Sequence, residues 1–165
     1  MPQRTLDGSP YQQRERRLLA EWLAARYPND RVQQQVRLGA YQIGISPQGL
    51  TSPELRALGV WRRIADAMVY KPTELILIEA SLPAHPGYVS QLILYKRLIP
   101  MTPELAAYAA LPVRMIYLVS FEDPVVTAMC RENGIQVEVY APPWVGDYWA
   151  ELERRKSRPP KSGGL

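Results

Sequence analysis

Two short runs of almost uninterrupted apolar residues constrain the fold of this chain more than any other feature. They are ELILIEASL at residues 74–82 and VRMIYLVSF at residues 113–121, and turn-forming residues precede the first of them. A run of this length, apolar at both odd and even positions, is typical of a strand that is buried on both faces. We therefore expect two central strands in a sheet that helices cover.

The other elements follow from periodicity and from turn residues. Helical spacing predicts helices at residues 11–26, 88–99, 124–133 and 144–156, and a shorter one at 102–111. Further strands are expected at 31–44, 61–70 and 135–142, with a loop and a short helical turn near 53–58 between the first two. In the first strand, Val32, Val36 and Leu38 are expected to share one face. The order α-β-β-β-α-β-α-β predicts an α/β fold with a mixed central sheet flanked by helices.

The length of the chain indicates its domain organisation, and its net charge indicates the kind of partner it binds. A chain of 165 residues fits one domain, which we place at residues 11–150, between a flexible arm at 1–10 and a basic, disordered tail at 151–165. The net charge of +4 favours nucleic acid as a partner. No apolar run is long enough to span a bilayer, no secretory signal is evident, and the single cysteine forms no internal disulfide. We therefore expect a cytoplasmic protein with no membrane partner.

Two acidic residues stand inside the predicted strands. Asp66 lies in the apolar stretch 64–69, and Glu79 lies near the end of the run at 74–82. A charge in such a place is costly unless it is paired or binds a cation. The tight turn KPTE would bring both carboxylates near one sheet edge, where two hard oxygen donors suit Mg²⁺ or Mn²⁺. Two alternatives stay open, namely an ion pair of Asp66 with Arg62 or Arg63, and a Glu79 that faces water.

The predicted helix at 88–99 presents polar side chains at helical spacing. Gln91 and Tyr95 are four residues apart and share one face. An amide and a phenol in this position could contact a carboxylate, a metal-bound water or a phosphate. Ordinary helix packing with a polar tip is the alternative. Lys96 is the next residue along the helix.

Taken in order, these residues resemble the motifs of a known nuclease superfamily. Asp66, then Glu79-Ala80-Ser81, then Q-x-x-x-Y at 91–95 is similar to the PD-(D/E)XK superfamily, and most similar to its RecB-type branch. The resemblance covers about residues 11–140 and implies a restriction endonuclease-like α-β-β-β-α-β core. It implies DNA as substrate and phosphodiester hydrolysis with Mg²⁺ or Mn²⁺, bound by Asp66, Glu79 and the carbonyl of Ala80.

The same resemblance implies supporting roles for residues on two helices. Gln91 and Tyr95 would support the site and contact the DNA backbone. Glu15 precedes Leu18, Leu19 and Trp22 by three, four and seven residues, so it shares their inward face and would lie near the metal. A solvated position in the charged run RERR is the alternative for Glu15.

One departure from the family pattern bears on activity. The lysine of the E-x-K motif is replaced by Ser81, whose hydroxyl cannot supply positive charge to the reacting phosphate. Lys96 is the preferred substitute, and Lys71 in the strand turn is the other. If neither reaches the site, the chain is a catalytically silent nuclease-like fold. It would then serve as a DNA-binding or assembly protein, a homo-oligomer or a phage-particle component located in a virion.

The remaining reactive and aromatic residues have simpler interpretations. His85 is the only histidine and is expected in a loop, close enough in sequence to Glu79 to lie near the site. Cys130 is expected to be a small buried apolar residue. The aromatic residues Trp144, Tyr148 and Trp149 either pack against the domain or stack on bases.

Overall fold

The computed structural model describes residues 10–40 and 62–157, and its centre is a five-stranded mixed sheet. The strand order is β1-β2-β3-β4-β5. The strands are β1 (Arg31–Leu38), β2 (Arg63–Tyr70), β3 (Leu75–Pro83), β4 (Val113–Phe121) and β5 (Ile135–Val139). Pairing is antiparallel from β1 to β3 and parallel from β3 to β5. The expected α/β fold with a mixed sheet is therefore confirmed.

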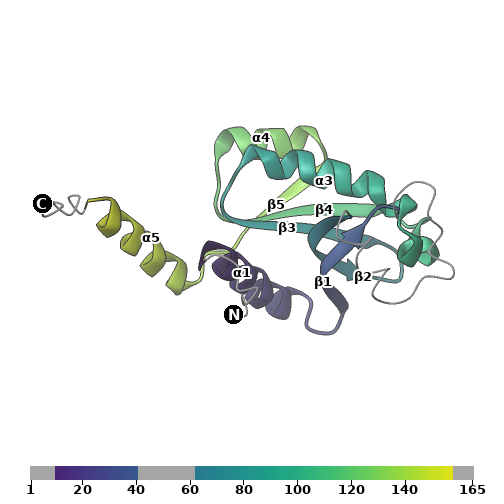
Figure 1. Cartoon of the computed structure of the whole chain (residues 1–165), viewed down its shortest axis with the longest axis horizontal. Coiled ribbons are helices and arrows are strands. Elements are labelled where there is room, and N and C mark those ends of the chain that lie inside the picture. Colours follow the sequence, from purple (N-terminus) through teal and green to yellow (C-terminus); the bar gives the residue numbers. More distant parts are fainter. Residues whose placement is uncertain (1–9, 41–61, 158–165) are drawn as a thin grey trace, which may run out of the picture.

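Helices cover both faces of this sheet. One face carries α1 (Pro10–Arg26) and the opposite face carries α3 (Pro86–Leu98) and α4 (Pro124–Glu132) (Figure 1). The 3-10 helix η1 (Ile99–Met101) follows α3, and the 3-10 helix η2 (Pro103–Tyr108) lies where a short helix was expected at 102–111. Helix α5 (Pro143–Lys156) is the last element of the described chain. Capping fixes where α4 begins, because the Asp123 carboxylate accepts hydrogen bonds from the backbone N–H groups of Val125 and Val126 at 2.8 and 3.1 Å.

The central strands divide their side chains between two apolar clusters. The α1-side cluster includes Leu18, Leu19, Trp22 and Leu23 of α1, and the α3-side cluster includes Val89, Leu92 and Tyr95 of α3. On β3, Ile76 and Ile78 pack in the α1-side cluster, whereas Leu75 and Leu77 pack in the α3-side cluster. All four side chains are fully buried. The sheet is therefore covered on both faces at β3, as the apolar run at 74–82 predicts.

Strand β1 differs from the expectation in its extent and in its facing. It ends at Leu38, and Gly39 follows with a φ of 100°. Residues 41–44 of the expected strand lie outside the described residues. Val32 packs against the α1-side cluster, whereas Val36 and Leu38 belong to the α3-side cluster, so the prediction of one shared face was wrong. The cause is Gln35, whose φ of 54° interrupts the regular alternation of the strand.

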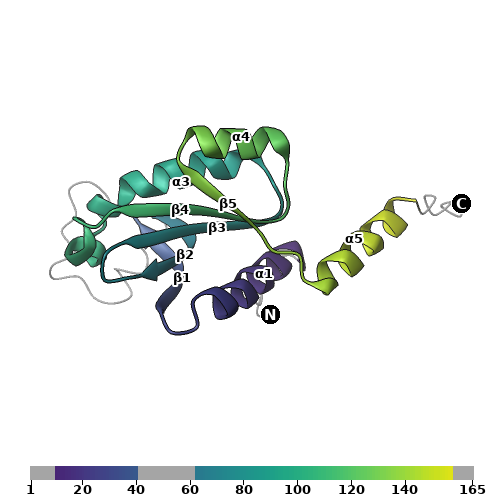
Figure 2. The same cartoon turned by 180° about the vertical axis from the view of Figure 1, so that it is seen from behind.

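The C-terminal helix extends beyond the expected domain. Residues 151–156 continue α5, as the helix expected at 144–156 predicts, although the domain division placed them in a disordered tail (Figure 2). Tyr148 is buried in the α1-side cluster, and Trp144 donates a hydrogen bond to Glu21 at 2.9 Å, so these aromatic residues pack against the domain. Residues 1–9 of the arm expected at 1–10, the turn expected at 53–58 and residues 158–165 lie outside the described residues. Pro10, also assigned to the arm, begins α1. Within the described chain, no helix has the length and apolar character that crossing a membrane requires.

Candidate active site

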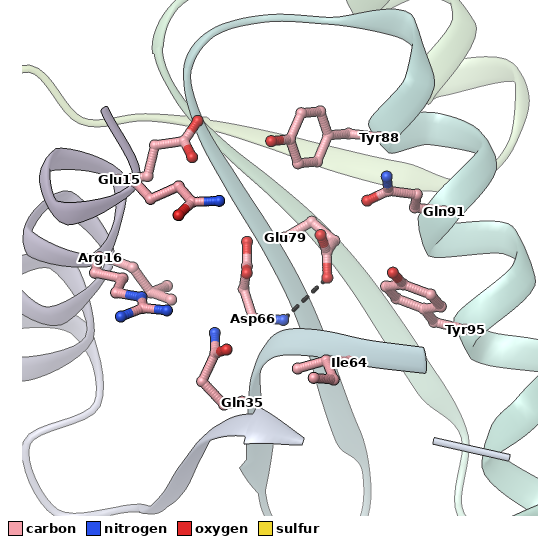
Figure 3. Close-up of a pocket in the computed structure, with 11 residues that line it drawn as sticks. Glu15, Arg16, Gln35, Ile64, Asp66, Glu79, Tyr88, Gln91 and Tyr95 are labelled. Carbon is pink, nitrogen blue, oxygen red and sulfur yellow. Dashed lines mark hydrogen bonds between the residues drawn. The ribbon is translucent and has the colours of Figure 1, made fainter. Parts of the chain in front are cut away.

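Asp66 and Glu79 meet at the point where β2 and β3 separate. The antiparallel register of these strands runs from Tyr70↔Leu75 to Ala67↔Ile78, and Asp66 and Glu79 stand at the next step. There the backbone N–H of Asp66 donates to the Glu79 carboxylate at 3.0 Å (Figure 3). The backbone N–H of Ala80 donates in turn to the Asp66 carboxylate at 2.9 Å. Side-chain carboxylates thus take the place of carbonyl acceptors between two strands, and both acids are directed to one spot.

The alternatives for these two acids do not describe the structure. Arg62 forms its ion pair with Glu104, at 2.6 Å, rather than with Asp66, and within the described chain no ion pair joins Asp66 to Arg63. Glu79 is only 3% exposed, so it does not face water at a strand end. We refer to Asp66 and Glu79 together as the carboxylate pair.

The carboxylate pair lies in a polar pocket of about 220 Å³, which we call the candidate site. Helix α1, strands β1 to β3 and helix α3 all contribute to its wall (Figure 3). The charged and amide side chains that line it include Glu15, Arg16, Gln35, Asp66, Glu79 and Gln91. Tyr88 and Tyr95 line it from α3. Hydrogen-bonding groups from five elements therefore converge on two acids.

Burial disfavours the charged forms of both acids. The pKa of Glu79 is raised to about 9, chiefly by burial, then by the negative charge of Asp66 and that of Glu15. Burial also raises the pKa of Asp66, against the lowering effects of the Ala80 N–H and of Arg16. Additional positive charge would therefore stabilise the ionised carboxylates. A cation between the two carboxylates would relieve both penalties at once.

The donor set suits a hard divalent ion that keeps much of its water. Among residues 10–40 and 62–157, no group of three or more His, Cys, Asp or Glu side chains is placed to hold a metal. Mg²⁺ usually binds proteins through one or two carboxylates and retains several waters. Two carboxylates in a pocket of this size therefore fit Mg²⁺ or Mn²⁺ better than an ion that needs a complete protein cage.

Ser81, where the resemblance would place a lysine, takes part in a structural hydrogen-bond network. Its hydroxyl donates to the Pro83 carbonyl at 2.6 Å and shares a 2.6 Å hydrogen bond with the Tyr117 hydroxyl. The Tyr117 hydroxyl also accepts from the backbone N–H of His85 at 2.8 Å. Ser81 is 1% exposed and does not line the candidate site. Through Tyr117, Ser81 links the end of β3 to the start of α3.

The other residues singled out from the sequence divide into two groups. Glu15, Gln91 and Tyr95 line the candidate site. Lys96 is exposed on α3 and does not line the pocket, because one helical step turns it away from Tyr95. Lys71 lies at the far end of β2, where it pairs with Asp30 at 3.1 Å.

Arg16 and Gln35 line the candidate site, and sequence reasoning missed both. A signal for Arg16 existed, since it precedes the buried Leu19 by three residues and so shares its face of α1. Its neighbours Arg14 and Arg17 instead stack on Tyr148 and Trp144 of α5, at 4.0 and 4.6 Å from the ring centres. No local signal marks Gln35, which has no turn signature in the sequence although its φ is 54°.

Comparisons with known proteins give fold-level similarity only. No family model and no curated protein matches this chain. Among solved structures, a repair endonuclease from Pyrococcus abyssi matches 84% of this chain at 14% identity, with a TM-score of 0.45. A structure titled as an EndoMS–dsDNA2 complex matches 87% of this chain at 12% identity, with a TM-score of 0.46. The chain spans about half the length of these structures, 50% and 49%.

Proposed function

We propose that this chain is a divalent-metal-dependent nuclease domain that hydrolyses phosphodiester bonds in DNA. The observation that carries the proposal is the carboxylate pair, with its two acids held by each other's strands inside a polar pocket. A buried pair of acids with raised pKa values in a pocket is typical of a functional site rather than of a structural ion pair. The net charge of +4 favours a polyanionic substrate.

In this proposal Asp66, Glu79 and the carbonyl of Ala80 hold Mg²⁺ or Mn²⁺. The Ala80 N–H donates to Asp66, and the carbonyl of a strand residue points to the same side as its N–H, so this carbonyl also faces β2. When bound, the metal would supply Lewis acidity and a more acidic water. Gln91 and Tyr95 orient the phosphate from α3 by hydrogen bonds.

Arg16 is our candidate for the positive charge that Ser81 cannot provide. Arg16 lines the candidate site and lowers the pKa of Asp66 by its charge, so it lies within electrostatic reach of the pair. A guanidinium beside the metal site would stabilise negative charge that develops on the phosphate oxygens. Lys96, which the sequence favoured for this cationic role, remains the alternative to Arg16.

Cleavage assays with isosteric variants test the proposal. Plasmid and single-stranded DNA are incubated with Mg²⁺ or Mn²⁺ and with wild type, Asp66→Asn or Glu79→Gln. Each variant is expected to lose about 100-fold or more of the cleavage rate, because each removes a ligand charge. Glu122→Gln, an exposed change of the same chemistry, serves as the control for purification and contaminating nuclease. Equal cleavage by wild type and both site variants would reject the site.

A second candidate, a silent nuclease-like fold used for assembly, is favoured by a separate observation. Phe121 and Val139, at the ends of β4 and β5, are 53% and 51% exposed, and Val125 on α4 is 70% exposed. Apolar side chains gathered at a sheet end are typical of an interface with a second copy or with another protein such as a phage component. This candidate predicts no cleavage under any metal condition and a stable oligomer in native mass spectrometry.

A further inference from the structure

The candidate site lies in the middle of a longer run of concave surface. On one side it shares Tyr88 and Gln91 with a recess near the start of α3, which we call the aromatic recess. On the other side it shares Gln35 with a groove along β1 and η2, which we call the arginine groove. Figure 3 shows Tyr88 and Gln91 on one side of the carboxylate pair and Gln35 on the other. The recess and the groove therefore adjoin the candidate site on either side, and we call the three hollows together the track.

Cationic side chains outnumber anionic ones in the arginine groove. Its lining includes Arg31, Arg37 and Arg62 against a single carboxylate, Glu104. Arg31 is held in place, since its guanidinium lies 4.4 Å from the ring centre of Tyr70 and donates to a tyrosine hydroxyl of η2 at 2.8 Å. A guanidinium fixed in this way loses little side-chain freedom when it binds a phosphate.

Two aromatic rings are positioned at the opposite end of the track. His85 is exposed, and its Nδ1 accepts from the backbone N–H of Gly87 at 3.1 Å, which fixes the ring at the start of α3. Tyr88 stacks on Tyr117 with ring centres 5.3 Å apart, so its ring is also held. The rings of His85 and Tyr88 lie 6.4 Å apart at an interplanar angle of 82°. Rings of this kind suit an unpaired base, because every base presents a flat face for stacking.

Gln35 lines both the arginine groove and the candidate site. Its φ of 54° is strained for a residue with a side chain, and it stands opposite Asp66 at the one step that the β1–β2 register passes over. Strained residues of this kind are concentrated at functional sites. The geometry here directs an amide side chain into both hollows.

From this arrangement we propose that the track binds an extended single-stranded segment of nucleic acid, with an internal phosphodiester at the carboxylate pair. The phosphates on one side contact the arginine groove, and a base on the other side stacks in the aromatic recess. The inference rests on the proposed function for its central subsite. It adds that the strand passes through the site instead of ending there, so the favoured reaction is internal cleavage.

Binding without metal tests the track independently of catalysis. The affinity of the full chain for a fluorescent single-stranded 20-mer is measured by anisotropy in EDTA at several salt concentrations. Arg31→Gln is expected to weaken binding and to reduce the salt dependence by about 0.7 in log–log slope, the value of one phosphate contact on a single strand. His85→Asn keeps an acceptor for the Gly87 N–H but removes the ring, so it should weaken binding about 5-fold or more with the slope unchanged.

Matched controls and a topological substrate complete the test. Arg131→Gln removes an exposed arginine on α4, and Phe121→Ala removes an exposed ring at the end of β4; both should bind like wild type. If Arg31→Gln and His85→Asn also bind like wild type, the track is wrong even if cleavage is observed. If binding behaves as expected but no metal supports cleavage, the nuclease proposal fails and the track stands. Cleavage of linear but not circular single-stranded DNA would overturn passage through the site.

Discussion

Replacing Glu79 by glutamine should stabilise the protein in the absence of metal, although it removes a proposed metal ligand. Glu79 is 3% exposed, and its pKa is raised from the ordinary 4.5 to about 9. Between these values the unfolded chain releases a proton that the folded chain keeps. Folding therefore takes up a proton, and the free energy of unfolding falls as pH rises from 4.5 to 9, by at most about 1.4 kcal/mol per unit.

The magnitude follows from the distance between the working pH and the ordinary carboxyl pKa. At pH 7, about 2.5 units above 4.5, the penalty amounts to about 3 kcal/mol. Glutamine carries no charge, and its Oε1 can still accept the Asp66 N–H that now lies 3.0 Å from the carboxylate. We expect Glu79→Gln to raise the free energy of unfolding by about 3 kcal/mol at pH 7, or roughly 6–12 °C in Tm for a domain of this size.

Urea unfolding in EDTA, followed by tryptophan fluorescence at pH 5, 6, 7 and 8, measures the effect. The gain of the variant over wild type should be small at pH 5 and should grow with pH. Glu122→Gln, on the surface, should change stability by less than about 0.5 kcal/mol at every pH. Added Mn²⁺ should stabilise wild type and narrow the gap, since a ligand of the folded state adds to its stability. A variant less stable than wild type at pH 7, or a gap independent of pH, would refute the reasoning.

Three further predictions concern single side chains around the candidate site. Arg16→Gln should lower kcat for DNA cleavage about 10-fold or more, whereas Lys96→Gln on the exposed side of α3 should have less than a 2-fold effect; the reverse order in steady-state assays would restore Lys96 as the cationic residue. Ser81→Ala should lower the free energy of unfolding by about 1–3 kcal/mol, because the buried Tyr117 hydroxyl loses a 2.6 Å partner, and an unchanged urea midpoint would contradict the network. Gln35→Gly should cost less than Gln34→Gly by about 1 kcal/mol, because glycine relieves the φ of 54° only at residue 35, and equal losses in thermal unfolding would contradict the strain.

Local sequence patterns were sufficient to predict the features that depend on segments close together in the chain. The apolar run at 74–82 predicts a strand buried on both faces, and β3 is such a strand. Asp66 and Glu79 could be expected near each other because the short turn at 71–74 sets the register of β2 against β3. The cap of α4 was likewise readable from Asp123 followed by Pro124.

Contacts between distant segments were beyond this kind of reasoning. The Ser81 hydroxyl is bound by Tyr117, which is 36 residues away and is brought close only by the parallel pairing of β3 and β4. The reversed facing of Val32 follows from one unusual φ at Gln35, a residue with no turn signature. Arg16 differs from its arginine neighbours only because α5 covers the other side of α1. In each case the deciding partner lies on another element.

The acceptor role of Glu79 bears on how such a chain would drift if selection for catalysis ceased. Glutamine offers the same oxygen to the Asp66 N–H and carries no buried charge. Random substitution in a protein kept only for its shape would therefore tend to replace the acid, because stability alone rewards the amide. Glutamate at position 79 is therefore the less stable choice, which supports the proposal that its negative charge binds a metal.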